Sequence, residues 1–290
     1  MRKIKFLKIY GERNTGTNLI SEIFKNQGVI QELPSSFIMR GFKNDSEPYL
    51  KRFADLKSKY LPKAGAVDEN IKKLIRERIY DDAVHYDRYE CLGWKHCRPN
   101  KSILLHDKNR FKKTLFIVIT KHPYFWVKSF YKNCYHNLTG VKIKKIGFED
   151  FLEMPWVSCA RDWVDKTIFD SVLELYRDKI NGYVELSDYA EHFIHIQYES
   201  LINSPDKYLD RVRSIISEDF PLLQMINESA KKDGNTMNDY RKKYDIKKVV
   251  CEDFFIDAIE KYFTQESISM FGYDIDPRLT KLSESPHFFK

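Results

Sequence analysis

The sequence lacks the features that mark several protein classes. Its five cysteines are odd in number and include no C-x-x-C pair, so neither a disulfide framework nor a zinc site is indicated, and a reducing compartment is the simpler interpretation. Apolar runs such as TLFIVIT, at residues 114–120, are far shorter than the ~20 residues that cross a bilayer. The N-terminus lacks the apolar core and cleavage site of a signal peptide. We therefore expect a cytoplasmic protein with no transmembrane segment.

Repeats, low-complexity tracts and strong charge are also missing. The 49 basic residues against 42 acidic ones give a net charge of +7, a mild excess that suits an anionic ligand but is common without one. No repeat of basic and aromatic residues predicts nucleic-acid binding. Apolar residues are plentiful, and 42% hydrophobic content with 14% aromatic content is ample for a packed core.

Predicted strands alternate with predicted helices along the chain. Apolar patterning places strands at residues 3–10, 114–120 and 192–197, a short one at 91–96, and helices at 16–27, 68–82, 124–135, 160–180, 205–217 and 250–266. One face of the helix at 160–180 would carry Val164, Ile168, Val172 and Leu175. This order predicts an α/β fold of three layers, with a mainly parallel central sheet flanked by helices. No linker is visible, so residues 1–290 are expected to form a single domain.

A glycine loop follows the first predicted strand. Gly11 and Gly16 have the G-x-x-x-x-G spacing of a P-loop, and they lie between a strand and a helix, the context that such a loop requires. Backbone N–H groups at the start of that helix are suited to hold a phosphate-like anion. A nucleotide triphosphatase needs Lys and Ser/Thr where Thr17 and Asn18 stand, so the loop predicts an anionic ligand held without a triphosphate–magnesium grip. The simpler alternative is an ordinary turn capped by Thr15 or Thr17.

Two further segments carry groups that suit the same chemistry. Lys121 follows the buried strand and Ser129 lies on the next helix, so both could meet one phosphate above the sheet edge, where ligands of such sheets bind. The alternative is a lysine that extends to solvent and a solvent-facing serine. In the segment 93–99, His96 is suited to take a proton near neutral pH and Lys95 to neutralise developing charge, although a single histidine is more often structural.

In their order along the chain, these segments resemble the P-loop sulfotransferases, which take a sulfuryl group from 3′-phosphoadenosine 5′-phosphosulfate (PAPS). Loop 11–18 is similar to the family's 5′-phosphosulfate loop, and residues 121–129 are similar to its 3′-phosphate motif. QYESLINSPDKYL at 197–209, GWKH at 93–96 and FGYD at 271–274 resemble further family segments. The resemblance is closest to bacterial members that modify polysaccharides or glycolipids, and it spans nearly the whole chain.

The resemblance implies a role for each of these residues. The 5′ end of the donor would be held by Arg13, Asn14, Thr15, Gly16, Thr17 and Asn18. The 3′-phosphate and the adenine would be bound by Lys121, Ser129, Tyr198, Arg241 and Lys242, although a plain charged loop is an equal alternative for the last two. Arg13 or Lys95 would stabilise the leaving oxygen. His96 would be the general base, with Glu12 and Glu22 as alternatives, and the motif requires no metal.

Two positions depart from the family pattern. Asn14 stands where the family usually has Lys or Arg, which leaves Arg13 or Lys95 to supply that charge. Lys121 replaces a more usual arginine, so the charge is kept while bidentate recognition is lost.

The acceptor is expected to be a hydroxyl on a sugar of a polysaccharide or glycolipid, and the product of the donor is adenosine 3′,5′-bisphosphate. Residues 34–66 and 135–147 are expected to be insertions on the acceptor side. Two other functions stay open, namely a P-loop kinase of small molecules that needs ATP and magnesium, and a non-catalytic module that binds a nucleotide or a glycan. The sequence indicates no oligomeric state.

Overall fold

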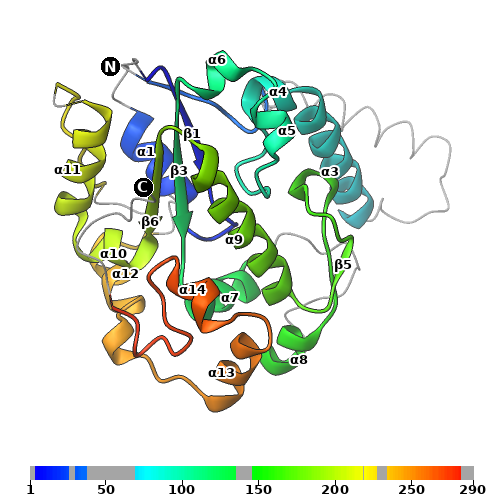
Figure 1. Ribbon diagram of the computed structural model, residues 1–290. Coiled ribbons are helices and arrows are strands. Elements are labelled where there is room, and N and C mark those ends of the chain that lie inside the picture. Colours follow the sequence, from blue (N-terminus) through cyan, green and yellow to red (C-terminus); the bar gives the residue numbers. More distant parts are fainter. Residues whose placement is uncertain are drawn as a thin grey trace, which may run out of the picture.

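Four parallel strands form the central sheet. The computed structural model describes residues 4–25, 30–37, 69–134, 146–217, 219–226 and 234–281. The strands are β1 (Phe6–Tyr10), β2 (Gln31–Glu32), β3 (Thr114–Thr120) and β6 (Phe193–Gln197), in the order β2-β1-β3-β6. Tyr10 is aligned with Val118 and Thr120 with Gln197, so the three longer strands end at one edge of the sheet (Figure 1).

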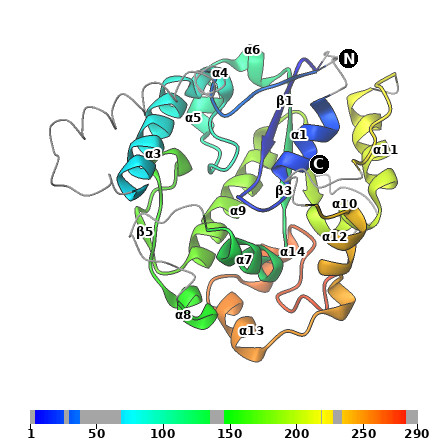
Figure 2. The same cartoon turned by 180° about the vertical axis from the view of Figure 1, so that it is seen from behind.

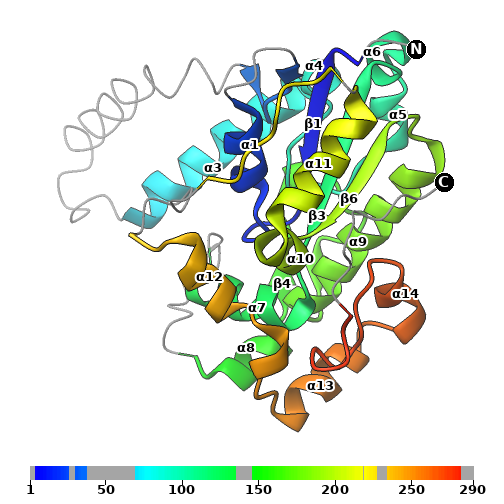
Figure 3. The ribbon, with the colours of Figure 1, turned by 90° about the vertical axis from the view of Figure 1, so that its left-hand side faces the viewer.

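Helices cover both faces of this sheet. α1 (Thr17–Lys25) and α9 (Val172–Tyr189) lie on opposite faces, as the view from behind (Figure 2) and the view turned by a quarter (Figure 3) show. Further helices are α3 (Glu69–Tyr86), α4 (Arg88–Cys91), α5 (Lys101–Leu104), α6 (Lys108–Phe111), α7 (Pro123–Lys132), α8 (Phe148–Glu153), α10 (Tyr198–Asn203), α11 (Pro205–Ile216), α12 (Met237–Lys243), α13 (Asp253–Glu260) and α14 (Gln265–Ser269). The predicted α/β fold, with a parallel central sheet flanked by helices, is confirmed.

Strand β3 lies at the centre of the core and leads directly into α7. All of its residues are buried, as the continuous apolar run predicts for a strand paired on both edges and covered on both faces. The His122 side chain then accepts a hydrogen bond from the Tyr124 N–H (3.1 Å), and Pro123 takes the first helical position, where no N–H is needed. Trp126 of α7 stacks on Tyr176 of α9 with ring centroids 4.1 Å apart, which packs the two helices against each other.

The prediction of a short strand at residues 91–96 is wrong, because the structure has a turn there. Helix α4 ends at Cys91, and Leu92 and Gly93 both have positive φ (56° and 82°), so the chain turns there and does not extend. A Cβ atom on Gly93 would lie 2.2 Å from the Trp163 ring, which explains why a residue without a side chain stands at this turn.

Two predicted helices are also corrected. The helix at 160–180 is wrong in its first half, because a 3-10 turn, η2 (Ala160–Asp162), is followed by Trp163 with φ 54° and by strand β5 (Ile168–Phe169), which pairs with β4 (Trp156–Val157). Ile168 is 57% exposed, so it shares no buried face with α9. The single helix predicted at 250–266 is two helices, α13 and α14, separated by a break at residues 261–264. A 3-10 turn, η3 (Ile246–Lys248), precedes α13.

Most of the two predicted acceptor-side insertions lies outside the described residues, namely 38–66 and 135–145. Residues 34–37 and 146–147 are the parts of these segments that the structure describes. Within the described ranges, no helix is long and apolar enough to cross a membrane.

Candidate active site

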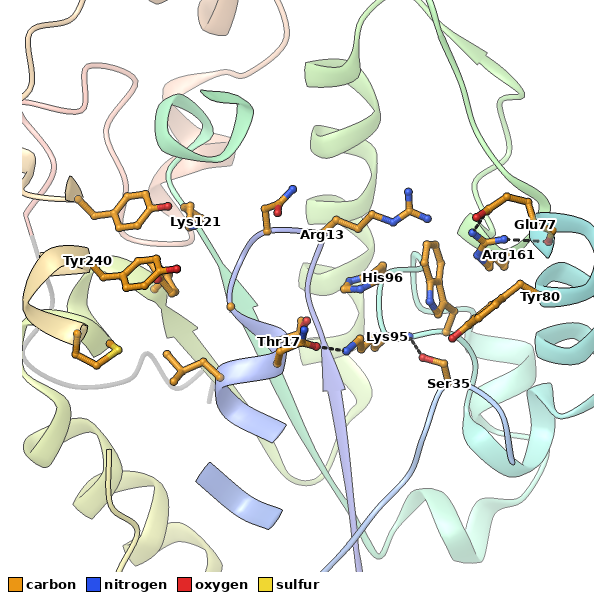
Figure 4. A pocket seen from close by; sticks show the side chains of 18 residues that line it. Arg13, Thr17, Ser35, Glu77, Tyr80, Lys95, His96, Lys121, Arg161 and Tyr240 are labelled. Carbon is orange, nitrogen blue, oxygen red and sulfur yellow. Dashed lines mark hydrogen bonds and ion pairs between the residues drawn. The ribbon is translucent and has the colours of Figure 1, made fainter. Parts of the chain in front are cut away.

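A cavity of about 510 Å³ opens at the end of the sheet where the strands have their C-termini. Arg13, Lys121 and Tyr198, which follow β1, β3 and β6, all line it. Figure 4 shows Tyr240 and Lys121 on one side of the cavity, His96 and Lys95 in the middle, and Tyr80, Glu77 and Arg161 on the other side. We refer to its two ends as the Lys121 end and the Arg161 end. The segments that the sequence singles out therefore meet in one place, because parallel strands bring their carboxyl ends together.

The loop after β1 is shaped by two glycines in close contact with neighbouring elements. A Cβ atom on Gly11 would lie 2.4 Å from the Ile119 carbonyl oxygen, and one on Gly16 would lie 2.6 Å from the Tyr198 ring. Gly16 also has φ 107° and Asn14 has φ 68°, values that glycine and asparagine adopt more readily than other residues. The loop therefore leads directly into the N-terminus of α1, where backbone N–H groups are suited to bind an anion.

His96 lies beside this loop and is held in one tautomer. Its Nδ1 donates to the Gly11 carbonyl oxygen at 2.6 Å, and because a carbonyl can only accept, the lone pair is left on Nε2. The Gly11 N–H donates in turn to the Lys95 carbonyl at 3.0 Å, which ties the two segments together. Burial, followed by the charges of Lys95 and Arg13, lowers the pKa of His96 well below its usual value of 6.5. The imidazole is therefore neutral at neutral pH, the form that accepts a proton.

Two cationic side chains lie near His96. Lys95 Nζ donates to Asn18 Oδ1 at 2.5 Å. The Arg13 guanidinium lies 4.6 Å from the centroid of the Trp94 ring, and the Arg13 carbonyl accepts a hydrogen bond from Trp126 Nε1 at 2.8 Å. Positive charge is thus fixed in the middle of the cavity, where it can stabilise negative charge that develops during a reaction.

The Arg161 end alternates cations with aromatic rings. The Arg161 guanidinium lies 4.5 Å from the Trp94 ring centroid and 5.1 Å from that of Tyr80. It also pairs with Glu77 and, at 2.7 Å, with Asp81, so most of its charge is balanced within the protein. Trp94 contacts both Arg13 and Arg161 and therefore links this end to the loop.

A buried ion triad underlies the loop. Lys179 of α9 pairs with Glu12 and, at 2.5 Å, with Asp162. Burial alone would lower the pKa of Lys179, but the two carboxylates raise it to about 12, so the ammonium group stays charged. Glu12 also accepts a hydrogen bond from the Arg13 N–H at 2.7 Å. These contacts, and its position outside the cavity wall, do not favour Glu12 as the general base.

The predicted site residues that the structure brings together in this cavity are Arg13, Asn14, Gly16, Thr17, Asn18, Lys95, His96, Lys121 and Tyr198. Thr15, Arg241 and Glu22 are not among the residues that line it. Thr15 is fully buried and its hydroxyl donates to the Glu12 carbonyl at 2.7 Å. Arg241 donates to a backbone carbonyl of α10 at 2.6 Å, and Glu22 pairs with Lys25 on the exposed side of α1 at 3.2 Å.

Ser129 and Lys242 line a second cavity of about 270 Å³. Tyr244 lines both cavities and adjoins both predicted phosphate-binding residues. Its hydroxyl oxygen lies 3.2 Å from Ser129 Oγ, and its ring centroid lies 4.3 Å from Lys121 Nζ. Lys121 and Ser129 therefore meet through Tyr244, which the sequence did not predict.

Other residues of the main cavity were also not predicted as site residues: Leu19, Ser35, Glu77, Tyr80, Trp94, Arg161, Met237 and Tyr240. The spacing of Tyr240 and Tyr244, and that of Glu77 and Tyr80, puts each pair on one helical face, a signal that was present in the sequence. Arg161 gives no such signal, because its partner Asp81 is 80 positions away.

No protein-family model matches the sequence, and a search of curated protein sequences found no match either. Among solved structures, the chain is similar to the sulfotransferase domain of the olefin synthase from Synechococcus PCC 7002. The two sequences are 14% identical, and the alignment covers 93% of this chain and 94% of the other, with a TM-score of 0.46. A similarity this distant supports no conclusion about the chemistry of this protein. The functional assignment below rests on the residues of the cavity alone.

Proposed function

We propose that the protein transfers a sulfuryl group from PAPS to a hydroxyl of an acceptor. The observation that carries this proposal is the shared cavity, in which a P-loop-like turn, a neutral His96 and cationic side chains open onto one space. The turn suits the anionic 5′ end of a nucleotide. Lys121, at the end of a different strand, supplies a separate positive charge for a second anion on the same ligand.

The donor is proposed to lie along the loop and the Lys121 end of the cavity. Its 5′-phosphosulfate would accept hydrogen bonds from the backbone N–H groups at Gly16 and Thr17, and its adenine would lie near Tyr198. Thr17 and Asn18 stand where an ATP-using P-loop needs Lys and Ser/Thr, which favours a donor held without a magnesium-bound triphosphate. A 3′-phosphate near Lys121 would distinguish PAPS from ATP.

Transfer is proposed to be in line and to invoke no metal. His96 Nε2 takes the proton of the acceptor hydroxyl while that oxygen forms a bond to sulfur. The bond between sulfur and the bridging oxygen of the donor breaks, and the bridging oxygen leaves with its negative charge as part of adenosine 3′,5′-bisphosphate. Arg13 and Lys95 stabilise that charge, since group transfer of this kind depends mainly on positioning and charge stabilisation.

The acceptor is proposed to enter at the Arg161 end, which lies beyond His96 as seen from Lys121 (Figure 4). Tyr80 and Trp94 offer aromatic surface there, and Glu77 offers a hydrogen-bond acceptor. This mixture suits a sugar of a polysaccharide or glycolipid. The acceptor-side role of residues 34–66 and 135–147, the single domain and the cytoplasmic location belong to the same proposal.

Thermal unfolding with three ligands tests the donor assignment. Adenosine 3′,5′-bisphosphate, with a chelator present, should stabilise the protein by about 2.7 kcal/mol at a concentration 100-fold above its Kd, whereas AMP at equal concentration should stabilise it less. Stabilisation by ATP and magnesium alone would instead identify a kinase. Transfer of radiolabelled sulfate from PAPS to a panel of glycans then separates an enzyme from a binding module, because a module would bind the bisphosphate without any transfer.

A further inference from the structure

Tyr244 lies at the junction of the two cavities. Its hydroxyl oxygen is 3.2 Å from Ser129 Oγ, and Lys121 Nζ lies between two rings, 4.3 Å from the centroid of Tyr244 and 4.0 Å from that of Tyr198. The two residues predicted to hold the 3′-phosphate therefore both adjoin the same phenol. A hydroxyl in this position is adjacent to any anion that Lys121 and Ser129 share.

Packing fixes the Tyr244 ring independently of its hydroxyl. Tyr244 is 4% exposed, and its ring meets the rings of Tyr198 and Phe125 nearly at right angles, with centroids 5.2 and 5.5 Å away. Tyr240 lies nearly parallel to it, at 6.1 Å and 11°. Phenylalanine at position 244 would keep these contacts, so the hydroxyl can be removed without displacing the ring.

The surroundings of the hydroxyl are positively charged. Burial would raise the pKa of Tyr244, but the charge of Lys121, the hydrogen bond with Ser129 and the charge of Lys243 lower it. A phenol whose ionised form is favoured in this way is a good hydrogen-bond donor to a negatively charged oxygen. The same positive field attracts a phosphate to this position.

We propose that the Tyr244 hydroxyl binds the 3′-phosphate of the donor, together with the Lys121 ammonium and the Ser129 hydroxyl. This inference rests on the proposed function. A lysine is a compact point charge that lacks the planar fork with which an arginine grips a phosphate, so it fixes the charge of an anion better than its orientation. Tyr244 supplies the directional donor that the lysine lacks, and exchanges its contact with Ser129 for one with a phosphate oxygen.

The test compares Tyr244→Phe with the unaltered protein by calorimetric titration of adenosine 3′,5′-bisphosphate and of AMP, which lacks the 3′-phosphate. Loss of a hydrogen bond to a charged group should weaken bisphosphate binding about 10- to 100-fold and leave AMP binding nearly unchanged. Tyr183→Phe is the matched control, since Tyr183 is also a buried tyrosine but lines neither of the two cavities. It should alter neither affinity.

Four other results would overturn the inference. If Tyr244→Phe weakened the binding of both ligands equally, Tyr244 would contact the part of the nucleotide that they share and not the 3′-phosphate. If Tyr244→Phe bound the bisphosphate more tightly, the hydroxyl would hinder binding of the 3′-phosphate. Unchanged bisphosphate binding would leave the 3′-phosphate to other groups while the proposed function stood. An unaltered protein that binds neither ligand would remove the proposed function itself. Should Tyr244→Phe unfold, Ser129→Ala offers a second probe, and it should weaken the bisphosphate selectively for the same reason.

Discussion

Replacement of Lys179 by methionine is expected to destabilise the protein strongly. Lys179→Met keeps a side chain of similar length but removes the ammonium between Glu12 and Asp162, and all three residues are at most 3% exposed. Two carboxylates would then be buried side by side without the Lys179 ammonium between them. Breaking a buried ion pair by removing one partner costs about 3–5 kcal/mol, a large part of the 5–15 kcal/mol of free energy of unfolding that is roughly typical of a domain.

The size of this loss should depend on pH with a definite sign. Without the ammonium, at least one carboxyl group is expected to bind a proton in the folded state, so its folded pKa rises above the unfolded value of about 4. A raised folded pKa contributes stability that is fully present below the unfolded pKa and is lost as pH rises through the folded pKa, by about 1.4 kcal/mol per pH unit. The destabilisation should therefore be greater at about pH 7 than at about pH 5.

Urea unfolding of both proteins at the two pH values measures these quantities. Lys25→Met is the matched control, because Lys25 pairs with Glu22 on the exposed side of α1, and exposed pairs contribute only about 0–1 kcal/mol. The double variant Glu12→Gln/Lys179→Met should regain part of the lost stability, since it removes one of the two buried charges. A loss below about 1 kcal/mol at neutral pH, or an equal loss at both pH values, would refute the reasoning.

Two histidines give further predictions. His96→Asn keeps an N–H donor for the Gly11 carbonyl but places no base where Nε2 lies. Transfer from PAPS should therefore slow about 10²–10⁴-fold, while calorimetry should show that bisphosphate binding is retained. An unaltered transfer rate would remove His96 from the role of general base. The lowered pKa of His96 should also place the acid limb of the rate profile below pH 6.5. Burial lowers the pKa of His122 to about 4, so the unfolded chain binds a proton below about pH 6.5 that the folded protein does not, and stability should fall by about 3 kcal/mol as pH drops from 6.5 to 4. His122→Asn, which keeps a side chain able to cap α7, should show a smaller fall in thermal unfolding across that range, and an equal fall would contradict the assignment.

The part of the fold that the sequence predicts correctly is the part that local patterns control. Strand β3 coincides with residues 114–120, because a continuous apolar run bounded by polar residues fits no exposed element. The meeting of the loop after β1 with Lys121 and Tyr198 follows from parallel pairing alone. The helix predicted at 160–180 fails in its first half because tertiary contacts override local preference there. Arg161 pairs with Glu77 and Asp81 of α3, and Asp162 pairs with Lys179 of α9.

The two ends of the cavity differ in how far the sequence predicts them, and the difference has a physical cause. An anion-binding loop at a helix N-terminus needs only consecutive residues in one turn. The segment from Gly11 to Asn18 is therefore enough to predict it from the sequence. The Arg161 end has no such segment, since Glu77, Trp94 and Arg161 come from three separate stretches of chain. Their arrangement depends on ion pairs and ring contacts whose partners are far apart in sequence.

Trp94 shows why such distant contacts matter for chemistry as well as for stability. One side chain contacts both the Arg13 guanidinium, proposed to stabilise the leaving oxygen, and the Arg161 guanidinium, proposed to lie on the acceptor side. Arg161 is fixed by α3, while the neighbour of Arg13 in the loop, Glu12, is fixed through Lys179 by α9. The position of the proposed leaving-group cation relative to the acceptor is therefore set by two helices outside the glycine loop. A motif search limited to that loop would find the proposed donor site and miss the contacts that align it with the proposed acceptor side.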